Sequence, residues 1–204
     1  MSNPDRVRKS RQEWKHLYTI VYFIIHMSKE LVLRWFLRSP EREFHIRQIA
    51  KIIGVTPMSA RKYLLELKKE GFITEAPTKF RAKNYQANTD DPLFQEELRH
   101  HHIQNIIRSG LLGTLNKELS LPTVIFFGSA AKGEDTSASD VDIFVLSETK
   151  KQISLELYEK ALGRRIQLFL LNSKEFDALK KKNKHLVNNI INGICLSGYL
   201  EVIA

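Results

Sequence analysis

The chain has 204 residues, of which 43% are hydrophobic, and a formal net charge of +9. This length fits one large domain or two small ones, and either can bury a real core. The single cysteine, Cys195, excludes a disulfide framework and a cysteine-rich zinc site, and its apolar neighbours predict a buried, unreactive thiol. The apolar run 17–25 is too short to span a bilayer, and no signal-peptide pattern accompanies it. We therefore expect a cytoplasmic protein with no membrane partner.

The positive charge is confined to the first half of the chain. Residues 1–89 hold 18 Lys and Arg against 8 Asp and Glu, whereas residues 90–204 hold 14 against 15. The first segment is therefore at +10 and the second at −1. Such an asymmetry predicts a polyanion partner for the first half, nucleic acid before membrane. The alternative is a basic face that is only solvated.

The first 27 residues divide into a polar, basic arm over 1–13 and a dense apolar segment over 14–27, for which we predict a helix. Ser28 is then expected to cap a helix over 29–38, which Ser39-Pro40 ends.

Two more helices follow, joined by a tight turn. Ile46, Ile49 and Ile53 repeat at helical spacing, and Gly54 is typical of the cap that ends such a helix. Thr56-Pro57 is expected to open the next helix, with threonine as its cap and proline in its first turn. The core positions of that helix are Ala60, Leu64 and Leu67. Four residues are left on its outer face near the N-terminus: Met58, Ser59, Arg61 and Lys62.

Beyond this helix a strand is predicted from Gly71-Phe72-Ile73 and a second strand over 79–85. Helix, turn, helix and two-stranded wing over residues 28–89 resemble a winged helix-turn-helix DNA-binding domain. The resemblance implies duplex DNA as partner, with the second helix at base edges and the wing at phosphates. The residues expected to contact DNA are Met58, Ser59, Arg61, Lys62, Lys79, Arg81 and Lys83. A winged helix used only for protein contacts is the alternative, and the apolar segment before it is compatible with a homodimer.

Asp90-Asp91-Pro92 is expected to close this first domain. The next segment, 92–119, has the apolar pattern of one or two helices, with Gly110 and Gly113 as candidate breaks. Its adjacent histidines, 100–102, would point to three sides of a helix, so we do not expect them to share a metal.

Two strands are predicted next, and the second carries a pair of aspartates. The apolar run Val124–Phe127 predicts a buried strand, and a turn at Gly128-Ser129 and a second glycine, Gly133, follow it. The next strand is expected over 140–145, and its period of two places Asp140 and Asp142 on one face. Two neighbouring carboxylates on an apolar strand are costly without a cation, and Mg²⁺, or Mn²⁺, suits oxygen ligands.

Gly128-Ser129, ten further residues and Asp140-Val141-Asp142 resemble the signature of the minimal nucleotidyltransferases of the polymerase-beta superfamily. The resemblance assigns residues 90–204 to such a domain, so we expect an α+β protein whose C-terminal mixed sheet is flanked by helices. It implies a nucleoside triphosphate held by Gly128 and Ser129, with Lys132 as an added phosphate contact. Asp140 and Asp142 would be the catalytic carboxylates and the metal ligands. A surface hairpin with two solvated aspartates is the alternative.

The remaining segments are expected to complete this domain. We predict a helix over 153–162, a strand over 166–171, a helix that Ser173 caps and Lys180–Lys182 end, further helix over 185–193 and a last strand over 199–202. For the lysine run, a solvated helix end is favoured over nucleic-acid binding.

The resemblance breaks at one position. Active members of the family carry a third carboxylate on the next strand, where this chain has Gln167, an uncharged residue that cannot act as a base. Two functions therefore stay open. One is an enzyme that transfers a nucleotidyl group from a nucleoside triphosphate to an acceptor, a protein among others, guided by a DNA-binding module. The other is a DNA-binding regulator whose transferase-like domain binds nucleotide or a partner protein without turnover, as an antitoxin binds a toxin.

Overall fold

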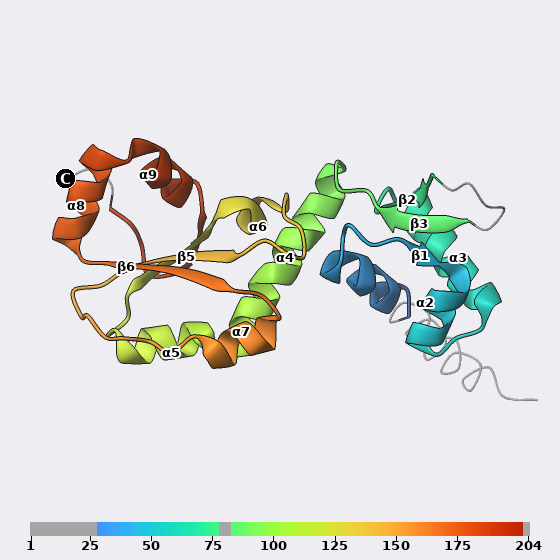
Figure 1. The fold of residues 1–204 in the computed structure, drawn as a ribbon, viewed down its shortest axis with the longest axis horizontal. Helices are drawn as coiled ribbons and strands as arrows, with labels where there is room; N and C mark the ends of the chain where they lie inside the picture. The colour runs from blue at the N-terminus through green and yellow to red at the C-terminus, as the bar shows by residue number, and fades with distance from the viewer. Residues whose placement is uncertain (1–27, 78–82, 202–204) are drawn as a thin grey trace, which may run out of the picture. The chain divides into compact units, whose positions relative to one another are not determined.

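The computed structural model describes residues 28–77 and 83–201, which form two compact units (Figure 1). The N-terminal unit comprises Met1–Phe36 and Glu43–Gln86, and the C-terminal unit comprises Leu37–Arg42 and Ala87–Ala204. The predicted arm and helix over 1–27, and the predicted DNA contacts Lys79 and Arg81, lie outside the described residues.

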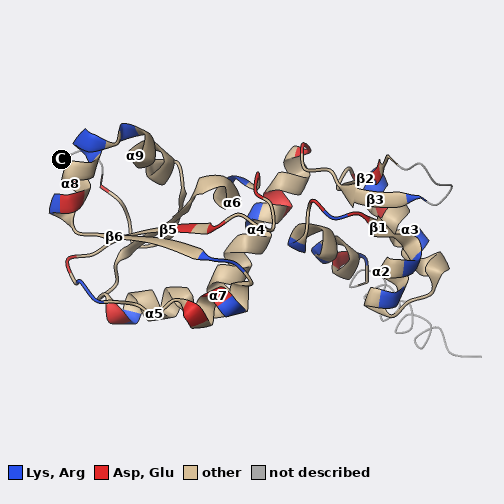
Figure 2. Ribbon diagram, in the orientation of Figure 1, with Lys and Arg blue, Asp and Glu red and all other residues tan. Residues whose placement is uncertain are grey.

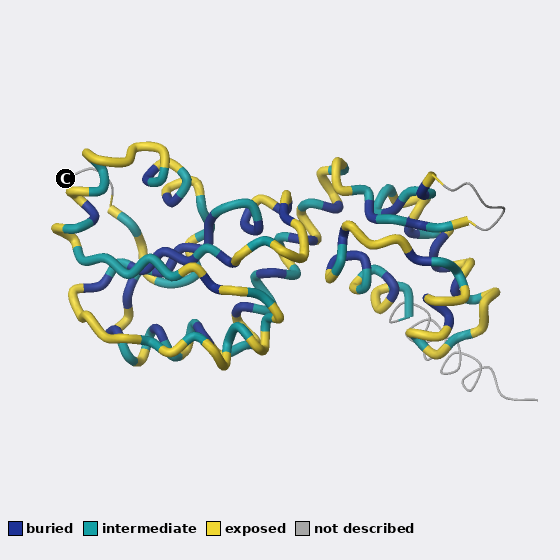
Figure 3. The backbone as a smooth tube through the Cα atoms, viewed as in Figure 1, coloured by how far each residue is buried: buried dark blue, intermediate teal, exposed yellow. Residues whose placement is uncertain are grey.

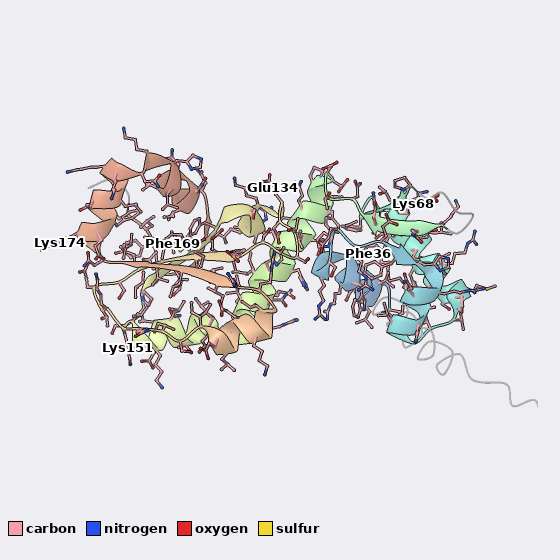
Figure 4. The ribbon with its side chains drawn as sticks, in the orientation of Figure 1. Phe36, Lys68, Glu134, Lys151, Phe169 and Lys174 are labelled. Carbon is pink, nitrogen blue, oxygen red and sulfur yellow. The ribbon has the colours of Figure 1, made fainter. Side chains whose placement is uncertain are left out.

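The N-terminal unit combines three helical segments with a small sheet (Figure 1). Residues 28–38 are helical, and the elements that follow are β1 (Phe44–His45), α2 (Ile46–Ile53), α3 (Pro57–Lys69), β2 (Ile73–Ala76) and β3 (Asn84–Ala87). The strand order is β1-β3-β2, and β1 and β3 are antiparallel with Phe44 opposite Tyr85. Both of these side chains are buried, and the ring of Phe44 meets that of Phe36 at 5.0 Å (Figure 4 labels Phe36).

The ends of α2 and α3 follow from the residues that cap them. Gly54 ends α2 with φ +72°, a left-handed conformation that favours glycine. Thr56 then caps α3, because its Oγ1 accepts a hydrogen bond from the Ser59 N–H at 3.2 Å, and Pro57 stands in the first turn. Ala60, Leu64 and Leu67 are fully buried, so both predicted helices and the core face of α3 are confirmed.

One prediction for this unit needs correction. The second strand was expected over 79–85, but Lys83 is not part of a strand, and β3 extends to Ala87. The reason is the burial pattern, since Tyr85 and Ala87 alternate into the core and set the pairing with β1.

The C-terminal unit is a four-stranded mixed sheet with helices on both faces (Figure 1). Its elements, in chain order, are α4 (Pro92–Ser109), α5 (Leu111–Glu118), β4 (Thr123–Phe127), α6 (Gly128–Lys132), β5 (Val141–Leu146), α7 (Glu156–Leu162), β6 (Ile166–Leu171), α8 (Ser173–Lys182), α9 (Lys184–Ile191) and β7 (Ile194–Ser197). The strand order is β6-β5-β4-β7, with β5 and β6 parallel and the other pairs antiparallel. The predicted α+β class and mixed sheet are confirmed.

Each face of this sheet has its own core, and the two central strands, β4 and β5, are the most deeply buried strands of the sheet (Figure 3). On one face, Val141, Ile143 and Val145 of β5 pack with apolar residues of α4, α5 and α7. On the other face the core is aromatic, with Phe127 5.5 Å from Phe169 between ring centroids. Phe169 lies on the α8 and α9 side of β6 (Figure 4). The alternation along β5 therefore separates the two cores and leaves Asp142 on the aromatic side.

The predicted helix over 92–119 is two helices. Asp91 caps α4 by accepting hydrogen bonds from the Leu93 and Phe94 N–H groups, and Gly110 ends it with φ +82°. Gly113, the other candidate break, lies inside α5. Among the described residues, no helix is both long enough and apolar enough to cross a membrane.

Several predicted ends in the second half are shifted. α7 begins at Glu156 rather than 153, with Leu157 exposed, and the cap of α8 is Asn172, not Ser173. The last strand is β7, earlier than the predicted 199–202, because its pairing with β4 buries Ile194 and Leu196 against the core. Cys195 alternates with them and is exposed, so the prediction of a buried thiol is wrong.

Candidate functional site

The Gly-Ser segment and Asp142 meet at one end of the sheet. β4 ends at Phe127, which lies opposite Asp142 on β5, and the chain then turns at Gly128 with φ +82°. A Cβ atom on Gly128 would lie 2.1 Å from Asp142 Oδ2. Both the backbone conformation and this close approach require glycine. The predicted turn is in fact the start of α6, a helix of five residues that includes Ser129 and Lys132.

The two aspartates of the signature differ in their surroundings. Asp142 is half-buried on β5, whereas Asp140 is exposed and precedes the strand, which begins at Val141 and not at the predicted 140. Burial raises the pKa of Asp142, and the neighbouring charge of Asp140 raises it further. The carboxylates therefore repel each other, and the charged pair is disfavoured in the folded protein.

A divalent cation fits this pair by its chemistry. A cation between the carboxylates would remove the repulsion, and Mg²⁺ is held in proteins by one or two carboxylates together with waters and substrate phosphates. In the part of the chain that the structure describes, no cluster of three or more His, Cys, Asp or Glu side chains is placed to hold a metal. Among the residues that the structure describes, Asp140 and Asp142 are thus a pair of carboxylates without a third at the same place.

Gln167 lies directly beside Asp142. The predicted strand 166–171 is confirmed as β6, and its pairing with β5 places Gln167 opposite Asp142. On the other edge of β5, the residue opposite Asp142 is Phe127 of β4. Directly paired residues point to the same face of a sheet, so the exposed Gln167 amide shares the face of Asp142.

The second glycine of the signature has a packing role. Gly133 ends α6 with φ +73°, and a Cβ atom there would lie 2.2 Å from the carbonyl oxygen of Gln95 in α4. The backbone of α6 can therefore rest on α4 only because this residue is glycine. Lys132, next to it, is exposed.

Comparison with known proteins places this geometry in a family. Residues 111–199 match the family model described as Polymerase beta, Nucleotidyltransferase. This segment is similar to a polymerase-beta nucleotidyltransferase domain. It contains Gly128, both aspartates and Gln167, whereas α4 and the N-terminal unit lie outside the match. No curated protein and no solved structure matches the chain.

The C-terminal unit contains an arrangement that the sequence did not predict. His102 on α4 and Arg164 before β6 meet Asp135, which lies in the loop between α6 and β5. Burial alone would raise the pKa of Asp135, but the hydrogen bond and charge of His102, together with Arg164, outweigh it and lower the pKa. The Arg164 guanidinium is thus paired with Asp135. The other two histidines of the run make separate contacts, His100 with Gln104 and His101 with Asn105.

The predicted DNA contacts of the N-terminal unit divide into two groups. Met58 is 83% exposed on α3, Arg61 and Lys62 are exposed beside it, and Ser59 is half-buried (Figure 2 shows the basic residues of α3). Lys83, which follows the undescribed part of the wing, forms an ion pair with Glu75 at 3.0 Å, and Lys62 on α3 lies 3.9 Å from Glu66. The exposed face of α3 also has a shallow groove, lined by Met58, Arg61, Lys62, Leu65, Glu66 and Lys69.

Proposed function

We propose that the nucleotidyltransferase domain binds a nucleoside triphosphate together with Mg²⁺ or Mn²⁺ and transfers a nucleotidyl group to an acceptor. The observation that carries this proposal is the contact of Asp142 with Gly128, beside the repelling charge of Asp140. It supports the proposal because a cation would relieve the repulsion between these carboxylates, and Asp142 lies against a glycine that leaves the backbone open to a phosphate.

Each residue of the signature has a role in this proposal. Gly128 has no side chain to keep a phosphate away from the backbone, and the Ser129 hydroxyl can donate a hydrogen bond to a phosphate oxygen. Lys132 is exposed one turn later and can contribute a positive charge. Asp140 and Asp142 would hold the cation, which when bound neutralises phosphate charge and helps to orient the attacking hydroxyl.

A second candidate function is nucleotide binding without turnover, and Gln167 favours it. At the position opposite Asp142, an amide can offer a weak oxygen ligand but no negative charge and no general base. A regulator that only binds nucleotide, or that only binds a partner protein such as a toxin, would need neither the third negative charge nor a general base. The two candidates differ in turnover and not in binding.

Release of pyrophosphate from labelled nucleoside triphosphate with Mg²⁺ or Mn²⁺ separates these candidates. If Gln167 limits turnover, Gln167→Asp should raise the rate, since general-base help is typically worth about 10²–10⁴-fold. Gln152→Asp, an exposed glutamine outside the sheet, is the matched control and should change nothing. A wild type that turns over well, with Gln167→Asp inert, would remove the second candidate. Absence of release from both proteins, although nucleotide binds, would remove the first.

We further propose that the N-terminal unit binds duplex DNA through α3. Supporting this are the exposed Met58, Arg61 and Lys62 and the excess of Lys and Arg over residues 1–89, 18 against 8 acidic residues. The order of its elements, a hairpin after two helices joined by a tight turn, is the order of a winged helix. Lys79, Arg81 and Lys83 would then contact phosphates.

Fluorescence anisotropy of a labelled duplex at several salt concentrations tests DNA binding with the full chain. The logarithm of affinity should fall with the logarithm of salt concentration by about 0.9 per neutralised phosphate. Exchange of Arg61 and Lys62 for alanine should weaken binding, whereas exchange of Lys181 and Lys182 on α8 should not. Binding that is absent, or that does not respond to salt, would contradict the proposal.

A further inference from the structure

A buried ionic cluster joins three segments of the C-terminal unit that are far apart in sequence. The Asp135 side chain is 2% exposed, and the side chains of His102 and Arg164 are 10% exposed. His102 Nε2 lies 3.0 Å from Asp135 Oδ1, and Arg164 Nη2 donates to Asp135 Oδ2 at 2.6 Å. Each carboxylate oxygen therefore has its own partner, and one belongs to α4 and the other to the turn before β6.

Arg164 also holds the backbone of the loop that leads to Asp140. Its Nη2 donates to the Thr136 carbonyl oxygen as well as to Asp135. That same carbonyl accepts the Ser139 N–H at 3.1 Å, and the Thr136 N–H donates to Ser139 Oγ at 3.1 Å. The two bonds close a turn that ends at the residue before Asp140.

The next bond along the chain fixes the other end of this loop. The Val141 N–H, between the two signature aspartates, donates to the carbonyl oxygen of Arg165 at 2.9 Å. Arg165 follows Arg164 directly and precedes the strand that carries Gln167. The segment from Asp135 to Asp142 is therefore tied to the start of β6 at both ends, first by a side chain and then by the backbone.

The composition of the cluster favours a geometric role over a stabilising one. Buried ion pairs are weak evidence of stability, because desolvation of the charges offsets much of their attraction. Arg164 Nε is in addition buried with no hydrogen-bond partner among the described residues, a cost that an apolar core would avoid. What the planar guanidinium offers is the fixed direction of the two N–H groups on Nη2, which here donate to a carboxylate and a carbonyl.

We infer that His102, Asp135 and Arg164 are positioning residues that hold the loop 133–140, and with it Asp140, at a fixed place relative to Asp142 and β6. The consequence for metal affinity rests on the proposed function, in which Asp140 and Asp142 hold a divalent cation. Partners that orient metal ligands typically change metal affinity by about 10–100-fold when they are removed.

The variant that tests this is Arg164→Lys in the full chain. Lysine keeps a positive charge near Asp135, but its ammonium sits on a flexible stem and lacks the fixed in-plane N–H directions with which Nη2 serves both the carboxylate and the Thr136 carbonyl. We expect faster amide hydrogen exchange over residues 136–141 in metal-free protein. We also expect Mn²⁺ affinity, measured from the free Mn²⁺ signal in electron paramagnetic resonance, to fall by about tenfold or more.

Leu115→Ala is the control for lost stability. Leu115 is fully buried on α5 and makes none of the cluster's hydrogen bonds, so its truncation destabilises the domain without touching the loop. It should leave exchange over 136–141 and Mn²⁺ affinity unchanged. A second variant, His102→Gln, removes the imidazole but keeps a donor for Asp135, and should have an effect smaller than that of Arg164→Lys.

The outcomes separate this inference from the proposed function. Wild type that binds no Mn²⁺ would contradict the proposed metal site, and the exchange measurement would still decide the positioning role. Wild-type binding that Arg164→Lys leaves unchanged, with unchanged exchange over 136–141, would overturn the inference alone. Equal effects of Arg164→Lys and Leu115→Ala would also overturn it, because they would show only lost stability.

Discussion

Two aspartates of the C-terminal unit, seven positions apart, are treated in opposite ways by the fold. Asp135 is more deeply buried, yet its pKa is lowered, because His102 and Arg164 more than offset the cost of burial. Asp142 is half-buried and its pKa is raised, by burial and by the charge of Asp140. The first carboxylate has the Arg164 guanidinium and a ring nitrogen of His102 as partners within the protein, whereas the second faces another carboxylate. Asp135 is thus satisfied within the protein, whereas a cation bound between Asp140 and Asp142, as we propose, would relieve their repulsion.

The largest loss of stability is expected when the buried ion pair of Asp135 and Arg164 is broken. Asp135→Asn removes the charge that compensates buried Arg164, and loss of one partner of a buried pair costs about 3–5 kcal/mol. We expect the free energy of unfolding in urea to fall by about 3 kcal/mol. The control is Asp177→Asn, which removes the exposed partner of Lys180 on α8, because exposed pairs contribute only about 0–1 kcal/mol. Equal losses for the two variants would contradict the structural role of Asp135.

The pH dependence of the same variant sharpens this test. Since the folded state lowers the pKa of Asp135, its contribution is complete above the unfolded value of about 3.9 and is lost as pH falls through the folded pKa. The stability difference between wild type and Asp135→Asn should therefore be constant from pH 5 to 7, as a rough window, and shrink in more acidic solution. A stability difference that grows in acid would show that folding does not lower the pKa of Asp135.

A bound metal ion should offset the stability cost of the ionised Asp142 side chain. A ligand that binds only the folded state adds about 2.7 kcal/mol at a free concentration one hundred times its dissociation constant. Saturating Mn²⁺ should therefore raise the unfolding free energy of wild type by about this amount and that of Asp142→Asn by much less. The measurement is urea unfolding with and without Mn²⁺. Equal stabilisation of both proteins would show that Mn²⁺ binds elsewhere.

The smallest effect is expected for Asp142→Asn without metal. Because the folded state raises the pKa of Asp142, its ionised form costs stability above the folded pKa, and the cost disappears as pH falls below the unfolded value. The variant should thus be slightly more stable at neutral pH, by about 0.5 kcal/mol or less, with the gain lost in acid. Thermal unfolding at pH 7 and at pH 4 measures the difference, and a clear loss of stability at pH 7 would contradict mutual repulsion.

The elements that the sequence predicted well depend on local patterns. The spacing of Gly128-Ser129 and Asp140-Val141-Asp142 implied two adjacent strands, and Gly128 does contact Asp142. The caps at Gly54 and Thr56 likewise gave the ends of α2 and α3. In each of these cases, residues close in sequence determine the structure.

What the sequence did not predict depends on contacts between distant segments. His102, Asp135 and Arg164 lie 33 and 29 positions apart, so no motif or periodicity connects them. The last strand was misplaced for the same reason, since its position follows from pairing with β4, some 70 residues earlier along the chain. Part of the predicted wing, Lys79 and Arg81, lies outside the described residues and stays a prediction.

The central claim is that Asp140 and Asp142 accept a cation that brings a nucleoside triphosphate to Gly128-Ser129. Isothermal titration calorimetry of the full chain with ATP and with GTP, with and without Mg²⁺, tests it most directly. Wild type should bind at least one of them only when Mg²⁺ is present, because the two carboxylates repel phosphate in its absence. The double variant Asp140→Asn, Asp142→Asn should lose this Mg²⁺-dependent binding while it remains folded. Equal affinity with and without Mg²⁺, or undiminished binding by the double variant, would contradict the assignment of the site.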